Sequence, residues 1–288
     1  MPRTWTSRAV HLAQTLHKIN DLKLENNLKR KIRKTYLSTF FLKRYDSQNK
    51  LANIAGYNVR FCTYRSLSYL FNEIFLDQEY CFVSNKTRPF IVDCGSNIGM
   101  SVIYFKMIYP NSEVLAFEPD EEAFACLEEN MKANEIHAVC LNRKAISNKE
   151  GDMDFYYDQD NPGSLGMSTF RERMPKNKKV VESVLLSKYI DREVDFLKLD
   201  IEGAERDVVE DLSNEGKLSY IKQILIEYHH HIVKDIDALS HMLRYLEDAG
   251  FGYEIQSGVE RPFKRQQFQD ILIYAYQKES LNESDLAA

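Results

Sequence analysis

The fold is decided by residues 90–99, FIVDCGSNIG. The apolar run Phe90-Ile91-Val92 predicts a buried strand, and Gly95 and Gly99 follow it closely. Glycines at this place let the backbone approach a ligand, and the helix expected after Gly99 offers free N–H groups at its N-terminus. The turn lacks the middle glycine of GxGxxG and the GK[ST] ending of a P-loop. It therefore predicts either a ligand site or a turn that serves only tight packing.

After this turn, short apolar runs alternate with helical patterns, which predicts repeated βα units around a parallel sheet. The expected strands cover 90–92, 114–117, 138–141, 195–199 and 221–226. A later helix is expected around 239–246 and ends at Gly250. Two last strands, near 253–256 and 271–276, have no helix between them, so we expect an antiparallel pair at the sheet edge.

A second motif, Phe117-Glu118-Pro119-Asp120, follows the next expected strand. A carboxylate about 20 residues beyond a glycine turn is placed to accept both ribose hydroxyls of an adenosine-type ligand. Taken alone, Glu118 is better explained as an exposed strand-end acid or a helix cap. Together with the glycine turn it favours adenosine binding, without separating NAD from S-adenosylmethionine.

A third motif, DFLKLDIEGAE at residues 195–205, completes a pattern with VDCGSNIG and FEPD. The three motifs resemble the FkbM family of S-adenosylmethionine-dependent methyltransferases, in which DxGxNxG, FEP[DN] and KxDIEGxE occur in this order. The resemblance covers about residues 88–230. It implies an α/β, class I methyltransferase fold, that is, a Rossmann-like sheet of seven strands with an antiparallel last strand pair. Residues 1–50 and the last strands lie outside it.

The resemblance also implies where S-adenosylmethionine would bind. The cofactor-binding residues that it implies are Asp93, Gly95, Asn97, Gly99, Glu118, Ala145, Ile146 and Asp200. The first four would lie along the methionine part of the cofactor and Glu118 at its ribose. The pair Ala145-Ile146, after the third strand, would sit near the adenine.

Catalytic residues are expected at the ends of the fourth and fifth strands, because ligands in open α/β sheets bind beyond the carboxyl ends of strands. An alcohol acceptor has a high pKa, so a general base or a metal helps its deprotonation. We expect Asp200 to touch cofactor and acceptor. Glu202 and Glu227 would bind the acceptor or a metal, and His229, on the same strand face as Glu227, would be the base. Glu205 is interpreted as an acid that favours the helix dipole.

Metal binding is a weaker expectation at this sheet edge. The carboxylates of Asp200 and Glu227 would suit Mg²⁺, which prefers oxygen ligands. Three adjacent histidines, residues 229–231, do not predict a shared metal site, because neighbouring strand side chains point to opposite faces. We therefore assign no metal ligand, keep Mg²⁺ as an optional cofactor, and interpret Tyr80 and Tyr228 as packing residues.

The overall composition fits one large domain with an appendage. The chain has 288 residues, a formal net charge of −5 and five cysteines without a CxxC pair. An odd cysteine count without Cys/His clusters argues against a disulfide framework or a structural zinc site, and fits a reducing compartment. The sequence lacks an apolar run long enough for a spanning helix, and its first residues lack the apolar core of a signal peptide. We expect a cytoplasmic protein.

The charge is unevenly distributed along the chain. Residues 1–50 contain 12 Lys/Arg and 3 Asp/Glu, with apolar residues at the spacing of one or two amphipathic helices. This segment is either a solvated helix face or a surface for an anionic membrane or for the acidic body of the protein itself. Nucleic-acid binding would need interleaved aromatic residues that are missing here. We divide the chain into a basic helical extension (1–50), a cap segment (51–87) and a methyltransferase domain (88–280).

Residues 158–179, rich in Gly, Pro, Asn and charge, are either a functional lid or disordered. Together with the cap they would set acceptor selectivity. The family resemblance suggests O-methylation of a hydroxyl on a sugar, a polysaccharide or a secondary metabolite, so the partner would be a small-molecule or glycan acceptor. The basic extension would then help at a membrane surface. The alternatives are a non-catalytic adenosine-ligand-binding or scaffold protein of the same fold and, less favoured, an NAD-dependent oxidoreductase.

Overall fold

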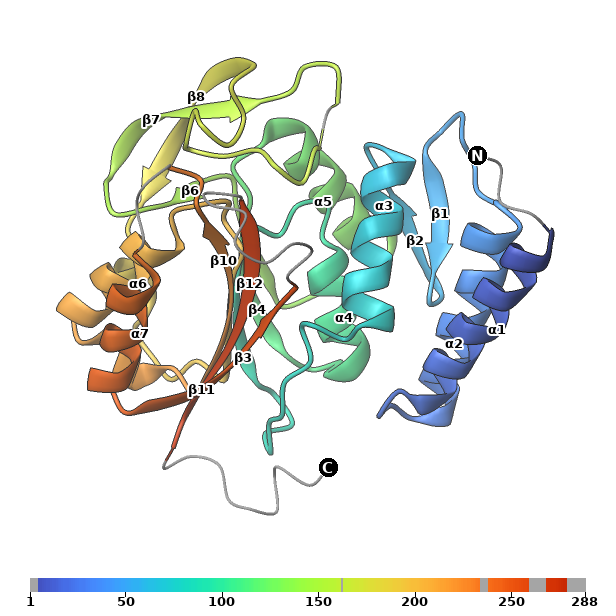
Figure 1. The fold of residues 1–288 in the computed structure, drawn as a ribbon, viewed down its shortest axis with the longest axis horizontal. Coiled ribbons are helices and arrows are strands. Elements are labelled where there is room, and N and C mark those ends of the chain that lie inside the picture. The colour runs from blue at the N-terminus through green and yellow to red at the C-terminus, as the bar shows by residue number, and fades with distance from the viewer. Residues whose placement is uncertain (1–4, 162, 234–237, 259–267, 279–288) are drawn as a thin grey trace.

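The computed structural model describes residues 5–161, 163–233, 238–258 and 268–278. Within these residues, seven strands form the central sheet in the order β5-β4-β3-β9-β10-β12-β11 (Figure 1). Their bounds are β3 Phe90–Cys94, β4 Glu113–Phe117, β5 Val139–Asn142, β9 Phe196–Leu199, β10 Gln223–His230, β11 Phe251–Ser257 and β12 Gln269–Gln277. The pairs among β5, β4, β3, β9 and β10 are parallel, whereas β12 runs antiparallel to both β10 and β11. This confirms the Rossmann-like sheet with an antiparallel last pair, and β12 is inserted between β10 and β11.

Helices cover both faces of this sheet (Figure 1). Their bounds are α4 Met100–Ile108, α5 Glu121–Ala133, α6 Glu205–Asn214 and α7 Leu239–Asp248. Helices α4 and α5 pack with Ile91 in one buried cluster, and α6 and α7 pack with Val92 in the other. Because successive strand residues point to opposite faces, β3 needs apolar residues on both of its faces, and Ile91 and Val92 supply them. Asp120 begins α5 as its cap, accepting hydrogen bonds from the backbone N–H groups of Glu122 and Ala123.

Residues 5–87 form a layer beside α4 (Figure 1). It consists of α1 Trp5–Asp21, α2 Asn26–Thr35, the π-helix η1 Tyr36–Phe41, β1 Leu51–Ile54, β2 Tyr57–Arg60, α3 Tyr64–Phe71 and the π-helix η2 Asn72–Leu76. Ile19 and Ile32 of the basic extension are fully buried in the same cluster as Leu67 and Phe71 of the cap. The extension therefore packs through its apolar stripe as the helical pattern predicts, while the domain boundaries at residues 50 and 87 stay a prediction.

A small second sheet, in the order β6-β8-β7, lies over the carboxyl ends of the central strands (Figure 1). It contains β6 Ala145–Ile146, β7 Gly151–Tyr157 and β8 Asn177–Val184, and the sequence analysis did not predict β7 and β8. Their connection covers most of the segment 158–179 and returns to β7 at the Tyr156–Ser168 bridge. Two 3₁₀ turns, η3 Leu186–Tyr189 and η4 Lys217–Tyr220, complete the elements. Across the described ranges, every helix is too short or too polar to cross a membrane.

Candidate active site

A cavity of about 330 Å³ opens at the carboxyl ends of β3, β4, β9 and β10. Its wall is built by the glycine turn, the end of β4, the strand β6, the cap elements α3 and η2, the described part of the segment 161–173, and the residues that follow β9. A cavity of this size is in the range of small-molecule sites. Most of its wall comes from connections, as the rule for ligand sites in open α/β sheets predicts.

The glycine turn is fixed against both neighbouring strands. The backbone N–H groups of Gly95 and Ser96 both donate to the carbonyl of Phe117, at 3.0 and 2.9 Å. Gly95 has a φ of +85°, and a Cβ added there would lie 1.9 Å from the carbonyl oxygen of Asp200. Only glycine therefore allows the turn to reach Asp200. The turn serves tight packing and also lines the cavity, and ligand binding by the turn stays a prediction.

Glu118 is a buried acid at the floor of this cavity, with 5% of its surface exposed. Its two carboxylate oxygens accept hydrogen bonds from the backbone N–H groups of Asn97 and Asp120, each at 2.8 Å. Burial, followed by the charge of Asp120, raises the pKa of Glu118 to about 8. Each oxygen keeps a second lone pair, so the group can accept further hydrogen bonds from a diol.

The residues expected around a cofactor separate into two groups. Those that line the cavity are Gly95, Asn97, Glu118, Ala145, Ile146 and Asp200. Asp93 and Gly99 are not part of the lining. Asp93 is fully buried and accepts a 2.5 Å hydrogen bond from Ser101, and a Cβ on Gly99 would meet Leu127 of α5. These two residues support the turn through contacts with α4 and α5.

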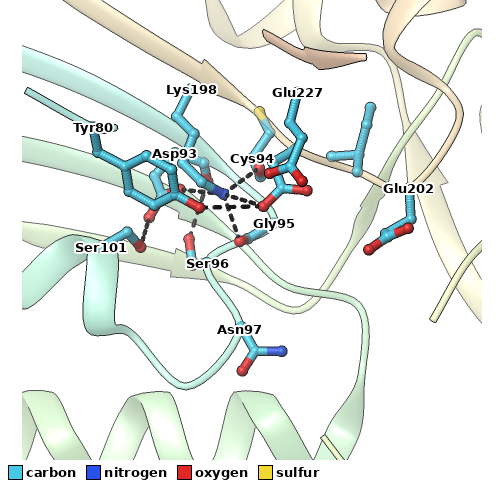
Figure 2. Close-up of polar contacts among 12 residues, drawn as sticks. Tyr80, Asp93, Cys94, Gly95, Ser96, Asn97, Ser101, Lys198, Glu202 and Glu227 are labelled. Carbon is cyan, nitrogen blue, oxygen red and sulfur yellow. Dashed lines mark hydrogen bonds and ion pairs between the residues drawn. The ribbon is translucent and has the colours of Figure 1, made fainter. Parts of the chain in front are cut away.

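Lys198 is the centre of a polar cluster that the sequence analysis did not identify (Figure 2). Its Nζ lies 2.9 Å from the Gly95 carbonyl oxygen, 3.2 Å from Asp200 Oδ2 and 3.6 Å from Asp93 Oδ1. Burial opposes its charge, but Asp200 and Asp93 outweigh burial and raise the pKa of Lys198. The available signal was a lysine inside the otherwise apolar Phe196-Leu197-Lys198-Leu199, because a fully buried lysine needs partners.

We expected Tyr80 to be a packing residue, but it also takes part in the polar contacts at the cavity. Its ring is buried, it lines the cavity, and its hydroxyl donates a 3.4 Å hydrogen bond to Asp200 Oδ2. Lys198 Nζ lies 5.0 Å from the centroid of the same ring. Asp200 is therefore held from two sides while it faces the cavity.

His229 lies beneath a layer of carboxylates. Its Nδ1 is 2.8 Å from Glu205 Oε1, and its Nε2 is 3.2 Å from Glu202 Oε2 and 4.0 Å from Glu227 Oε1. Burial lowers the pKa of His229, but Glu202 and Glu205 outweigh it and raise that pKa well above the usual value. The cavity is lined by Glu202 and Glu227 and not by His229, whose side chain is 1% exposed. The structure thus places His229 behind the cavity lining, and its expected role as the base stays a prediction.

Glu205 also does more than favour a helix dipole. It begins α6 as expected, but it is fully buried. Its Oε1 accepts hydrogen bonds from the backbone N–H groups of Ile201 and Gly203, at 3.3 and 2.9 Å, and lies against His229. An oxygen that accepts two backbone donors is an acceptor toward the imidazole as well. We therefore place a proton on His229 Nδ1.

The segment 158–179 closes over Glu202. Arg173 Nε donates a 2.6 Å hydrogen bond to Glu202 Oε2, and Ser168 Oγ donates to the Glu202 carbonyl. Glu202 has a φ of +57°, the left-handed region that a non-glycine residue rarely occupies, and such residues gather at functional sites. Burial raises the pKa of Glu202 to about 7. The described residues of this segment contact Glu202 and line the cavity, and a function as a lid stays a prediction.

A potential metal-binding group lies at the same end of the cavity. Within the residues that the structure describes, one ligand atom from each of Asp200, Glu227 and His229 lies within 4.8 Å of the others. The His230 and His231 rings face each other, with their centroids 3.6 Å apart. Asp270 of β12 adds a fourth polar group, with Oδ1 3.9 Å from His229 Nε2.

Comparison with known proteins identifies the family of this chain. The family model described as the methyltransferase FkbM domain matches residues 93–253. The methyltransferase sdnD of Sordaria araneosa is 29% identical over 217 residues, covering 64% of this chain and 81% of that protein. The 31-O-demethyl-FK506 methyltransferase FkbM of Streptomyces tacrolimicus is 26% identical over 222 residues, with the same coverage. The 2-O-methyltransferase NoeI of Sinorhizobium fredii is 28% identical over 148 residues, covering 43% of this chain and 57% of that protein. Because the family model covers more than half of this chain, the chain belongs to the FkbM methyltransferase family.

Proposed function

We propose that this methyltransferase moves the methyl group of S-adenosylmethionine to a hydroxyl group of a small-molecule or glycan acceptor. The observation that carries the proposal is the buried Glu118 carboxylate, which lies beside the glycine turn in the same cavity as the acidic ends of β9 and β10. One end of the cavity can therefore hold an adenosine, and the other can hold and deprotonate an acceptor.

The residues present fit this cofactor. Glu118 would accept hydrogen bonds from the two ribose hydroxyls, and the buried pair Ala145-Ile146 would offer apolar surface to the adenine. Gly95 and Asn97 would lie along the methionine part. The cofactor carries a positive sulfonium, to which the carboxylate of Asp200 is complementary. Bound there, S-adenosylmethionine supplies a methyl group that is already activated for transfer.

The work left to the chain is to align an acceptor oxygen and to take its proton. Asp200 is our proposal for the residue that touches both ligands, since Lys198 and Tyr80 hold its Oδ2 while the residue lines the cavity. Glu202 is our proposal for the proton acceptor, since Arg173 holds one of its oxygens and the residue lines the same cavity. Glu227 would bind a neighbouring acceptor group, and His229 would position Glu202 from below.

Hydroxyl groups are the acceptors that this chemistry favours. Carboxylates in a confined cavity accept hydrogen bonds from polyols, and they repel anionic acceptors. Two of the relatives carry names that specify O-methylation. We infer a sugar hydroxyl or a hydroxyl of a secondary metabolite as the methylated group.

The proposal is tested by calorimetric titration with S-adenosylmethionine and, separately, with NAD. We expect the wild type to bind S-adenosylmethionine at micromolar concentration, and Glu118→Ala to weaken this binding by about 1–3 kcal/mol, the range for hydrogen bonds to a charged group. Glu122→Ala is the matched control, because Glu122 is an exposed acid in the first turn of α5, only four residues after Glu118. Tight NAD binding, or equal affinities in the two variants, would refute the cofactor assignment.

A further inference from the structure

We propose that Asp200, Glu227 and His229 form a binding site for one divalent transition-metal ion at the acceptor end of the cavity. The role of this ion, to bind the acceptor oxygen, rests on the proposed function. Binding of the ion does not depend on the proposed function and can be measured without cofactor or acceptor.

The first argument is the orientation of His229. Its side chain is 1% exposed, and Glu205 fixes the proton on Nδ1. The other nitrogen, Nε2, is directed at the carboxylates of Glu202, Glu227 and Asp270. Metal-binding histidines typically have this arrangement, in which a carboxylate holds one ring nitrogen. An ion would displace the proton that Nε2 shares with Glu202, so that the Nε2 lone pair faces the ion.

The second argument is distance. Ligand atoms that lie about 2.1 Å from one ion are separated from each other by about 3–4 Å, according to the angle between them. His229 Nε2 is 4.0 Å from Glu227 Oε1, and no pair in the group with Asp200 exceeds 4.8 Å. Small side-chain rotations would bring the three atoms to one ion. Glu227 and Asp200 also line the cavity, which gives the ion a path to the site.

The third argument is charge. Six carboxylates meet around this end of the cavity, and three basic groups stand against them even when His229 is protonated. The acids are Asp93, Asp200, Glu202, Glu205, Glu227 and Asp270, and the basic groups are Lys198, Arg173 and His229. Charges that are close together in a buried region repel strongly. Because an imidazole must be neutral to bind an ion, a divalent cation would displace the proton of His229 and lower the excess from three negative charges to two.

The donor set indicates which ions would bind. One imidazole nitrogen with two carboxylates suits Mn²⁺, Fe²⁺ or Zn²⁺, whereas Mg²⁺ prefers oxygen ligands alone. The site therefore differs from the Mg²⁺ site that the sequence suggested for Asp200 and Glu227, because His229 joins it. An ion here would lower the pKa of a bound hydroxyl and orient its oxygen.

The experiment uses the full chain, freed of metal with a chelator, and Mn²⁺ as the probe. Calorimetry should show one saturable Mn²⁺ site, and pulsed electron paramagnetic resonance should show coupling of the ion to a ¹⁴N nucleus. We expect His229→Gln to abolish the nitrogen coupling and Glu227→Gln to weaken Mn²⁺ binding at least tenfold. Glu79→Gln, a cap acid outside the group, should bind as the wild type does, and Mg²⁺ should bind more weakly than Mn²⁺.

Absence of saturable binding at millimolar Mn²⁺, or binding without nitrogen coupling, would overturn the proposal. So would equal Mn²⁺ affinities in Glu227→Gln and Glu79→Gln. If His229→Gln does not fold, the nitrogen coupling of the wild type and the Glu227→Gln titration decide the matter. Glu118→Ala separates the two proposals, because it should impair cofactor binding and leave Mn²⁺ binding unchanged.

Discussion

The two ends of the cavity, which we propose as a cofactor end around Glu118 and an acceptor end around Asp200 and Glu227, are built in different ways. At the cofactor end, the hydrogen bonds of Glu118 go to Asn97 and Asp120, so the site is made within one βαβ unit of about 30 residues. At the acceptor end, Tyr80 comes from the cap, Arg173 from the segment between β7 and β8, and Asp270 from β12. The first end can be recognised from local motifs, whereas the second exists only once distant parts of the chain have packed together.

The two ends also differ in charge. The cofactor end has a single acid at its floor, held by backbone N–H groups, whereas the acceptor end gathers carboxylates that depend on Lys198, Arg173 and His229. Changes at the acceptor end should therefore affect catalysis and stability strongly, and changes at the cofactor end should affect binding more moderately.

The largest effect is expected for Glu202→Gln. Loss of a general base typically lowers a rate by about 10²–10⁴-fold, so kcat should fall within this range while cofactor affinity stays as in the wild type. The measurement is transfer of a labelled methyl group from S-adenosylmethionine to hydroxylated acceptors chosen by screening. Arg173→Lys keeps a positive charge beside Glu202 and should retain more activity. Wild-type kcat in Glu202→Gln would remove this residue from the mechanism.

A second prediction concerns Lys198 and the stability of the acceptor end. Lys198→Met leaves the buried Asp93 and the half-buried Asp200 without their cation, and breaking a buried ion pair costs about 3–5 kcal/mol. The free energy of unfolding in urea should fall by that amount.

The chain offers a matched control for this change. Lys106 of α4 is also buried, but its Nζ donates to the carbonyl oxygen of Ser112. Lys106→Met should therefore cost less, about 1.5–3 kcal/mol, the typical value of one hydrogen bond made by a charged group. Equal losses in the two variants would mean that burial of the side chain, and not the pairing of Lys198 with its acids, stabilises this region.

The comparison also explains which features could be predicted from sequence. Strands such as Val114–Phe117 are continuous apolar runs between turn signals, and Glu118 directly follows one of them, so pattern and motif identify both. The strand β8 alternates between half-buried and exposed residues in a charged stretch and gives no apolar run, which is why it was missed. Tyr80 and Asp270 reach the site through strand order and cap packing, and neither is encoded in neighbouring residues. His229 was found by its spacing from Glu227, but its burial beneath Glu202 depends on where α6 begins.

The smallest effect is a pH dependence at the cofactor end. Burial raises the pKa of Glu118 to about 8, so at pH 7 only about one molecule in ten carries the carboxylate that accepts the ribose hydroxyls. Glu118 would accept the ribose hydroxyls as a carboxylate. The protonated form must therefore lose its proton before S-adenosylmethionine binds in this way. Affinity for S-adenosylmethionine should therefore increase as the pH rises from 6.5 to 8.5, by at most about tenfold per pH unit, and level off above the pKa. Calorimetry at three pH values measures this, and Glu118→Gln, which does not titrate, should bind weakly with little dependence on pH. If the affinity of both proteins changes equally with pH, the titrating group lies outside the cofactor end. The carboxylates near Asp200 are then the next candidates.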